Sequence, residues 1–267
     1  MKNYSILVTL RRIINFIERP KRVHRFKHFL TYHIMRNFEP DGKYMLIGVN
    51  GYKAVVKKNP GMRYPTTIWV NQYYEKDTTE YLKNLLKPGD TVIDIGANFG
   101  YFTLLMAKLV GPNGLVIAFE PDAEMYQLLE YNIMLNKFDN IVMAVNMAVA
   151  DRNAFLEFYI NEVGGYSSLY DRVGTKRKVI VPCITLDSFH FKDVKFVKMD
   201  VECAELSVLA GMRRTIRDNP NMQILLEYAP IECGVKAVQF VSALPDYKLK
   251  FIDENGILAR RKQKWQG

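Results

Sequence analysis

The segment from Asp94 to Gly100 combines residue types that suit ligand binding. Asp94 precedes a turn bounded by Gly96 and Gly100, and this turn lies between an apolar run at 91–95 and a helical pattern at 102–110. The two glycines allow the backbone to turn sharply and to approach a ligand closely. A loop between a strand and a helix is also where parallel sheets bind nucleotide-like ligands. The pattern therefore predicts a cofactor at this loop.

Two carboxylates narrow the chemistry of that cofactor. Asp94 would face the pyrophosphate of a dinucleotide, which is unfavourable, whereas it suits the cationic amine of S-adenosylmethionine. The spacing D-x-G-x-N-x-G also differs from the G-x-G-x-x-G of NAD-binding loops, and no P-loop lysine follows. Glu120 ends the next strand, 26 residues after Asp94, where an acid can accept hydrogen bonds from ribose hydroxyls. The predicted cofactor is therefore S-adenosylmethionine.

Three further carboxylates follow the later strands. Asp200 and Glu202 come after the apolar run 194–199, and Glu227 comes after the run 222–226. If these strands are parallel, their ends lie beside the cofactor loop. Methyl transfer to a hydroxyl needs in-line placement and a base for the leaving proton, and we expect Asp200 to be the base or to orient the acceptor. Glu202 and Glu227 would bind acceptor hydroxyls or a divalent cation.

A purely structural role for these acids stays open, because an acid at a helix N-cap or in a first helical turn is favoured by the helix dipole. This alternative applies to Asp200, Glu202 and Glu205. The acids show no sharp ligand spacing, so the sequence assigns no metal and leaves the divalent cation as an open alternative. The sequence lacks the Asn/Asp-Pro-Pro-Tyr/Phe motif of enzymes that methylate base amines, which favours hydroxyl chemistry.

From residue 91 the chain alternates between strand and helix patterns. Alternating β and α segments predict an α/β fold with a mostly parallel sheet covered by helices on both faces. The expected strands are 91–95, 115–119, 141–145, 194–199, 222–226, 247–252 and 257–260, with an inserted pair at 154–160 and 178–181. The expected helices are 75–86, 102–110, 123–135, 204–216 and 231–244.

Residues 1–70 are expected to form a basic N-terminal extension, and residues 71–267 the cofactor-binding domain. An apolar helical spacing at 4–18 precedes a basic and aromatic stretch at 21–38, and Asn50-Gly51 between two apolar runs predicts a β-hairpin. Residues 1–43 contain ten basic and three acidic residues, and residues 259–267 contain four basic residues and no acidic one. Basic ends favour an anionic surface such as membrane headgroups, nucleic acid or a glycan, or they serve solubility.

The three cysteines are Cys183, Cys203 and Cys233, with no CxxC pair. Their scatter and odd number argue against a disulfide framework and predict thiols in a reducing compartment. We therefore expect a cytoplasmic protein, whose basic ends also allow peripheral contact with the inner face of a membrane.

Several motifs resemble the FkbM-type methyltransferases over roughly residues 72–230. They are Val92 to Thr103 (VIDIGANFGYFT), Ala118 to Pro121 (AFEP), Asn132 to Asn136 (NIMLN), Ser167-Ser168-Leu169, Thr185-Leu186-Asp187, Lys198 to Glu202 (KMDVE) with Glu205, and Leu226-Glu227. The resemblance implies the seven-stranded class I methyltransferase sheet. It also implies that Asp94, Gly96, Ala97, Asn98, Gly100 and Glu120 surround S-adenosylmethionine, with Ala148 near the adenine.

One position departs from the family pattern. The residue after Asp200-Val201-Glu202 is normally glycine, and this chain has Cys203. Cysteine is tolerated there if its φ is negative, and a positive φ would cost about 1 kcal/mol. A reactive thiol at the rim of the active site is the functional alternative. Ser167 and Ser168 would line the acceptor pocket or lie in a plain loop.

The leading hypothesis is an S-adenosylmethionine-dependent O-methyltransferase acting on a hydroxyl of a glycan or small metabolite. The first alternative is an RNA-modifying methyltransferase that holds phosphates with its basic ends, although the strand-end motif makes nucleic acid the less favoured partner. The second is a non-catalytic protein of the membrane surface with a methyltransferase fold. Fold and cofactor do not define the methyl acceptor.

Overall fold

The structure is a computed structural model that describes residues 44–57, 68, 73–161, 167–171, 174, 177–228, 232–244, 247–252 and 256–261. The chain divides into two compact units, residues 1–76 and residues 77–267. The helical pattern at 4–18, its basic continuation at 21–38 and the basic residues after 261 lie outside the described residues.

The first unit contains the expected hairpin. Strands β1 (Tyr44–Val49) and β2 (Tyr52–Lys57) pair antiparallel, and alternate side chains of each strand are buried. Asn50 and Gly51 connect them with positive φ values of 50° and 78°. Two such residues in succession make the tight turn that matches the twist of antiparallel strands. The hairpin prediction is confirmed.

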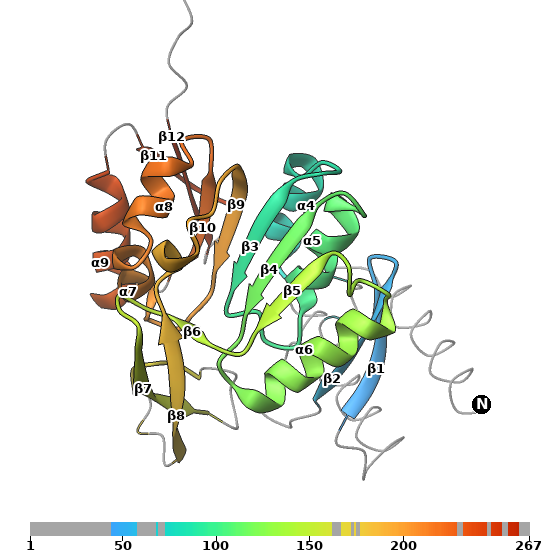
Figure 1. Cartoon of the computed structure of the whole chain (residues 1–267). Helices are drawn as coiled ribbons and strands as arrows, with labels where there is room; N and C mark the ends of the chain where they lie inside the picture. Colours follow the sequence, from blue (N-terminus) through green and yellow to red (C-terminus); the bar gives the residue numbers. More distant parts are fainter. Residues whose placement is uncertain are drawn as a thin grey trace, which may run out of the picture. The chain divides into compact units, whose positions relative to one another are not determined.

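The second unit is built on a seven-stranded sheet within the described residues. The strand order is β11-β12-β10-β9-β3-β4-β5 (Figure 1). The strands are β3 (Thr91–Ile95), β4 (Leu115–Phe119), β5 (Val142–Val145), β9 (Val194–Met199), β10 (Gln223–Glu227), β11 (Tyr247–Phe251) and β12 (Gly256–Arg261). Strand β12 runs in the opposite direction to the other six strands of this sheet, so it pairs antiparallel with both β10 and β11. The chain therefore places β9, which comes late in the sequence, directly beside β3.

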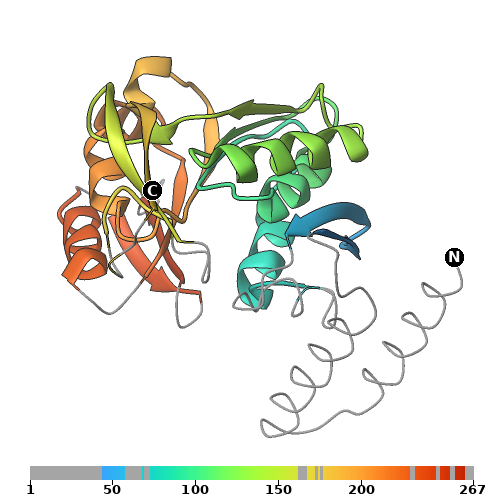
Figure 2. The same cartoon turned by 90° about the horizontal axis from the view of Figure 1, so that it is seen from below.

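Helices cover both faces of this sheet, as expected. Helices α5 (Tyr101–Val110) and α6 (Ala123–Leu135) lie on one face, and α7 (Glu205–Ala210), α8 (Arg213–Asp218) and α9 (Glu232–Ser242) lie on the other (Figures 1 and 2). Helix α4 (Lys76–Leu85) precedes β3. Burial of nearly the whole of α5 explains its apolar composition, and Asp122 caps α6 by accepting hydrogen bonds from the N–H groups of Glu124 and Met125.

A second, three-stranded sheet follows β5, in the order β6-β8-β7. It consists of β6 (Ala148–Val149), β7 (Ala154–Ile160) and β8 (Arg177–Ile184), and a 3-10 turn, η1 (Leu186–Phe189), leads to β9. Strand β8 extends well beyond the expected range 178–181. The apolar residues of β7 and β8 that face inward form their own small core with β6.

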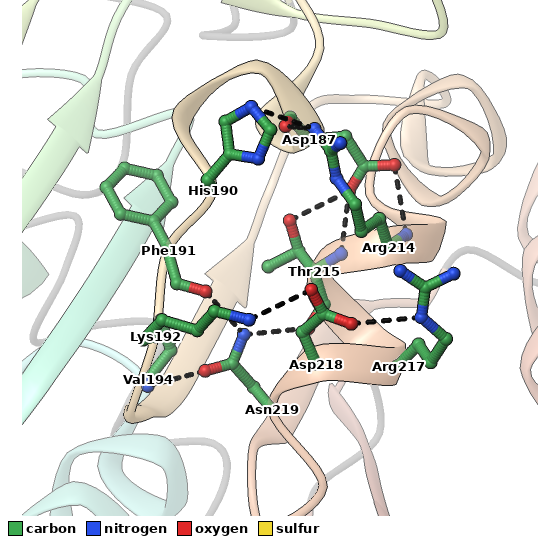
Figure 3. Close-up of polar contacts among 10 residues, drawn as sticks. All are labelled: Asp187, His190, Phe191, Lys192, Val194, Arg214, Thr215, Arg217, Asp218 and Asn219. Atoms are coloured by element: carbon green, nitrogen blue, oxygen red, sulfur yellow. Dashed lines mark hydrogen bonds and ion pairs between the residues drawn. The ribbon is translucent and has the colours of Figure 1, made fainter.

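The single helix expected over 204–216 is wrong, because α7 and α8 are separate helices. Gly211 lies at the break, where a Cβ atom would stand 1.9 Å from the carbonyl oxygen of Ala150. The carboxylate of Asp187 then accepts hydrogen bonds from the N–H groups of Arg214 and Thr215 and from the Thr215 hydroxyl, and so starts a new helix (Figure 3). Asp187, the last residue of the Thr185-Leu186-Asp187 motif, therefore caps the N-terminus of α8.

The far end of α8 is tied to the same region by Asn219. Its side-chain oxygen accepts from the N–H of Val194 at 2.9 Å, and its amide donates to the carbonyl of Phe191 at 2.9 Å (Figure 3). These bonds join α8 to the start of β9. They hold the N-terminal end of β9, and Asp200 follows the C-terminal end of the same strand.

Candidate functional site

The carboxyl ends of four parallel strands meet at one edge of the main sheet. Asp94 lies in β3, Glu120 follows β4, Asp200 follows β9 and Glu227 ends β10. The register aligns Ile95 with Met199 across β3 and β9, and Met199 with Leu226 across β9 and β10. The expected convergence of these strand ends is therefore a feature of the sheet itself.

The loop after β3 is tightly packed against the end of β9. Gly96 has φ +83°, and a Cβ atom there would lie 1.8 Å from the carbonyl oxygen of Asp200. Gly100 has φ +97°, and a Cβ atom there would lie 2.7 Å from the Leu129 side chain. Gly96 excludes a side chain because the backbone of Asp200 occupies the space, whereas Gly100 is favoured mainly by its positive φ, since the Leu129 side chain can shift.

Asn98 closes this loop. It has φ +53°, and its side-chain oxygen accepts a hydrogen bond from the N–H of Phe99 at 2.8 Å. Asparagine tolerates the left-handed region better than most residues because its side chain can satisfy nearby backbone groups in this way. The N–H groups of Gly96 and Ala97 donate to the carbonyl of Phe119 at 3.0 Å. The loop is therefore anchored to β4 before any ligand binds.

The Asp94 side chain is only half satisfied. It is 1% exposed, and its Oδ2 accepts from the Thr103 hydroxyl at 2.6 Å, while Oδ1 is buried and has no hydrogen-bond partner. Burial raises the pKa of Asp94, and the Lys198 ammonium opposes that rise. A buried carboxylate oxygen without a partner is costly. A ligand that brings a cationic or N–H donor to Oδ1 would remove that cost.

Glu120 joins the cofactor loop to the start of α6. One carboxylate oxygen accepts from the N–H of Asn98 at 2.7 Å, and the other accepts from the N–H of Asp122 at 2.8 Å. Burial raises the pKa of Glu120 to about 8, although these two hydrogen bonds lower it. Asn146 donates to the carbonyl of Glu120 at 2.8 Å and fixes the backbone at this position.

Asp200 and Glu227 form a hydrogen-bonded pair beside the buried Lys198. The Lys198 ammonium lies 2.9 Å from Asp200 Oδ2 and 4.8 Å from the centre of the Phe102 ring. Burial raises the pKa of Asp200, but Lys198 and the hydrogen bond with Glu227 bring it below its ordinary value. The charge of Asp200, together with burial, raises the pKa of Glu227 to about 11. At neutral pH Asp200 is therefore ionised and Glu227 holds the proton between them.

The free energy of unfolding is expected to fall as the pH rises from about 5 to 8. Glu120 and Glu227 keep their protons in the folded protein up to pKa values of about 8 and about 11, but lose them near 4.5 when unfolded. Each such group lowers the stability by about 1.4 kcal/mol per pH unit. The lowered pKa of Asp200 acts only below this window.

Glu227→Gln keeps a donor for Asp200 but does not titrate. Urea unfolding from pH 5 to 8 should therefore give the variant a shallower slope than wild type, by about 1.4 kcal/mol per pH unit. Between pH 8 and 9 the difference in stability between the two proteins should keep growing, since Glu120 is then ionised in both. Parallel stability curves for the two proteins would contradict the raised pKa of Glu227.

The turn after β9 carries Glu202 in an unusual backbone conformation. Glu202 and Cys203 have φ values of +52° and +78°, which non-glycine residues rarely adopt. The Ser168 hydroxyl donates to the carbonyl of Glu202 at 2.6 Å, and the Glu205 carboxylate accepts from the N–H of Cys203 at 3.2 Å. Ser168 is buried. It supports this turn, whereas Ser167 accepts a hydrogen bond from the N–H of Asn161.

The expectation of three free thiols is wrong. Cys203 forms a disulfide with Cys233 in the first turn of α9, with Cα atoms 5.3 Å apart, and only Cys183 remains a free, buried thiol. The two partners are 30 residues apart, so sequence spacing gives no sign of the pairing. The structure also explains the glycine of the family pattern, because φ at position 203 is positive. The argument for a reducing compartment loses its basis.

The same turn brings three acids together. Asp200, Glu202 and Glu227 each offer a carboxylate oxygen, and these oxygens lie within 4.8 Å of one another. Three oxygen ligands at this separation are of the kind that Mg²⁺ or Ca²⁺ uses, completed by water or substrate. Among the described residues, these three acids are the group that could hold a divalent cation.

Comparison with known proteins decides the family. The model of the methyltransferase FkbM domain matches residues 94–247, which is more than half of the chain. The chain belongs to the FkbM methyltransferase family. The predicted resemblance is confirmed, and the cofactor of this methyltransferase is S-adenosylmethionine.

Curated relatives match the FkbM chain over shorter segments. Protein-L-isoaspartate O-methyltransferase of Caenorhabditis elegans is 41% identical over 54 residues, which cover 20% of this chain and 24% of the relative. Ribosomal protein L11 methyltransferase of Bacillus cytotoxicus is 33% identical over 95 residues, which cover 34% of this chain and 27% of the relative. The chain therefore spans about a quarter of the length of these relatives.

One solved structure to which the chain is similar is the S-adenosylmethionine-dependent O-methyltransferase from Thermotoga maritima. It is 16% identical, covers 87% of this chain and 83% of its own, and gives a TM-score of 0.46. An O-methyltransferase from Bacillus cereus in complex with SAH is 12% identical, with a TM-score of 0.46 and coverage of 70% and 81%.

The geometry of this FkbM site fits S-adenosylmethionine. Asp94 Oδ1 is buried without a hydrogen-bond partner, so it can accept a hydrogen bond from the ligand amine. The glycines at positions 96 and 100 place no side chain in the loop. Ala148 lies in β6, and its side chain packs in the small core of the three-stranded sheet.

No helix in the described part of the chain has the length and apolar character needed to cross a membrane.

Sequence reasoning missed three residues that contact the candidate site residues. Thr103 binds Asp94, Asn146 binds the backbone of Glu120, and Lys198 binds Asp200. A signal was available for Lys198, because a lysine inside an apolar strand is rarely buried without a charged partner. Thr103 and Asn146 look like ordinary helix and loop residues, and no local pattern distinguishes them.

Proposed function

We propose that this protein transfers the methyl group of S-adenosylmethionine to a hydroxyl of a glycan or small metabolite. The observation that carries the proposal is the contact between the cofactor loop and the strand-end acids. Gly96 packs directly on the backbone of Asp200, whose carboxylate pairs with Glu227. A methyl donor held by that loop would lie beside carboxylates that can bind a hydroxyl.

On the cofactor side, Asp94 would accept a hydrogen bond from the amine of the methionine portion at its unpartnered Oδ1. Glu120 would accept the ribose hydroxyls with the lone pairs that its two backbone donors leave free. Gly96, Ala97, Asn98 and Gly100 would form the surrounding backbone, and Ala148 would lie near the adenine. S-adenosylmethionine supplies an electrophilic methyl group when bound.

On the acceptor side, the ionised Asp200 would accept a hydrogen bond from the acceptor hydroxyl and orient its free lone pair. An oxygen that gains a methyl group becomes strongly acidic, so a carboxylate of low basicity suffices to take its proton. Glu227, which holds the proton of the pair, and Glu202 would bind further hydroxyls of the acceptor. Lys198 is a positioning residue that keeps Asp200 ionised.

Asp94→Asn tests the cofactor half of the proposal. Asparagine can still accept from Thr103, but its NH₂ group replaces Oδ1 and would face the ligand amine with a donor. Calorimetry with S-adenosylmethionine should give binding about tenfold to a hundredfold weaker than wild type, the cost of one charged hydrogen bond. Asp90→Asn, at the opposite end of β3, is the control and should bind normally. Unchanged binding by Asp94→Asn would refute the assignment.

Tritiated-methyl S-adenosylmethionine tests the acceptor half. Glycan, lipid and RNA pools would be incubated with wild type and with Asp200→Asn, which should keep cofactor binding but lose most transfer. Label in the glycan or metabolite fraction that survives mild alkali is the expected result, because ethers are stable there and methyl esters are not. Label confined to RNA, or released by alkali as methanol, would rule out the proposed acceptor class.

A further inference from the structure

A disulfide lies one residue away from a proposed acceptor-binding acid. Cys203 follows Glu202 in the turn after β9, and its partner Cys233 lies in the first turn of α9. Both cysteines are partly exposed to solvent, so a small thiol can approach the bond. Helices α7 and α9 also pack on each other.

The disulfide holds a backbone conformation that the turn's residue types do not favour. Cys203 has φ +78°, where a β-carbon is strained and where the family pattern has glycine. Noncovalent support comes from polar contacts such as those of Ser168 with the Glu202 carbonyl and Glu205 with the Cys203 N–H, and from Val201, which packs against the main core. The bond to α9 adds a covalent restraint at the residue that follows Glu202.

The surroundings of the bond do not depend on it. Ala237 and Val241 of α9 are buried in the main core together with Val208 and Leu209 of α7. We therefore expect α9 to remain docked when the bond is opened. Asp94 and Glu120 are fixed on β3 and β4 through their own hydrogen bonds.

We propose that Cys203–Cys233 is a thiol–disulfide exchange site that controls the acceptor side of the active site. The reactant is a low-molecular-weight thiol or a dithiol protein. Its thiolate attacks one sulfur to give a mixed disulfide and releases one cysteine thiolate, and a second reductant thiol displaces the other. Two electrons and two protons pass to the protein, and the reductant leaves as its disulfide. The reduced turn relaxes from the left-handed region and carries Glu202 away from Asp200 and Glu227.

The proposal rests on the proposed function only for the role of Glu202, so its test uses neither cofactor nor acceptor. The full-length protein is prepared oxidised and after dithiothreitol treatment. Native alkylation with iodoacetamide and mass spectrometry should label Cys203 and Cys233 only after reduction. Buried Cys183 should remain unlabelled in both samples, which provides an internal control. Labelling of Cys203 in the oxidised protein would overturn the proposal.

Hydrogen–deuterium exchange of residues 198–206 then measures the turn itself. Reduction should speed exchange of the Cys203 amide at least tenfold in wild type. Cys203→Ala keeps the strained β-carbon without the bond and should exchange fast in either buffer. Cys203→Gly relieves the strain and should exchange slowly in both. An unchanged wild-type rate on reduction, or equal rates in the alanine and glycine variants, would overturn the proposal.

Discussion

Gly96→Ala is expected to lower affinity for S-adenosylmethionine by more than about a hundredfold, and to destabilise the second unit by several kcal/mol. The new Cβ atom would lie 1.8 Å from the carbonyl oxygen of Asp200, which belongs to the backbone and has no other rotamer. The loop or the end of β9 must move. Either movement disturbs the cofactor loop and the strand-end acids together. Calorimetry with the cofactor and urea unfolding measure the two effects.

Gly89→Ala separates crowding from backbone strain. Gly89 has φ +92°, close to that of Gly96, but no atom lies within 4 Å of its hypothetical Cβ. The control should therefore lose only about 1 kcal/mol of stability and should bind the cofactor normally. Equal losses in the two variants would show that positive φ alone accounts for the effect, and that the contact with Asp200 is unimportant.

Lys198→Met is expected to cost about 2–3 kcal/mol of stability at pH 7, less than the loss of one partner from a fully buried ion pair, because the Asp200 side chain is 30% exposed. Lys198 is 4% exposed, and its ammonium lies 2.9 Å from Asp200 and lowers the pKa of Asp94 as well. Methionine fills a similar volume, so the loss is electrostatic rather than steric. Urea unfolding measures it directly.

The sign of the pH dependence identifies the cause. Asp200 has a lowered pKa in wild type, so it adds stability above pH 4 that is lost as the pH falls through its folded pKa. Without Lys198 that pKa rises, and the variant should recover part of its deficit at pH 4.5, where the carboxyls can take up protons. Lys198→Arg keeps the charge and should lose much less. A deficit independent of pH would point to packing instead.

Much of the cofactor side was predictable because its determinants are local. The loop from Gly96 to Gly100 needs residues that tolerate positive φ, and glycine and asparagine are visible as such in a sequence. The strand that precedes it is a short apolar run, and the order of β and α segments indicates a parallel sheet. The residue types alone therefore indicated where the acids at 94 and 120 would lie.

The proposed acceptor side, with Asp200, Glu202 and Glu227, depends on contacts between distant segments, which a single sequence does not reveal. Cys203 and Cys233 become neighbours only because α9 packs beside α7. The break between α7 and α8 depends on Asp187, which lies on the other side of β9 in the chain. The raised pKa of Glu227 likewise requires that Asp200 of the adjacent strand be its hydrogen-bond partner. The periodicity of a segment indicates its secondary structure and its buried face, but not which other segment packs against it.

The position of β9 beside β3 has a consequence for biosynthesis. Strand β3 can pair with β4 as soon as both leave the ribosome, but its other neighbour is made about 100 residues later. Contacts between segments so far apart in the chain form slowly and late. Until β9 docks, Gly96 has no Asp200 carbonyl to pack on, and a nascent chain that already contains the whole cofactor loop has an unfinished binding site. Bound cofactor is therefore expected to stabilise the chain only after β9 has been synthesised.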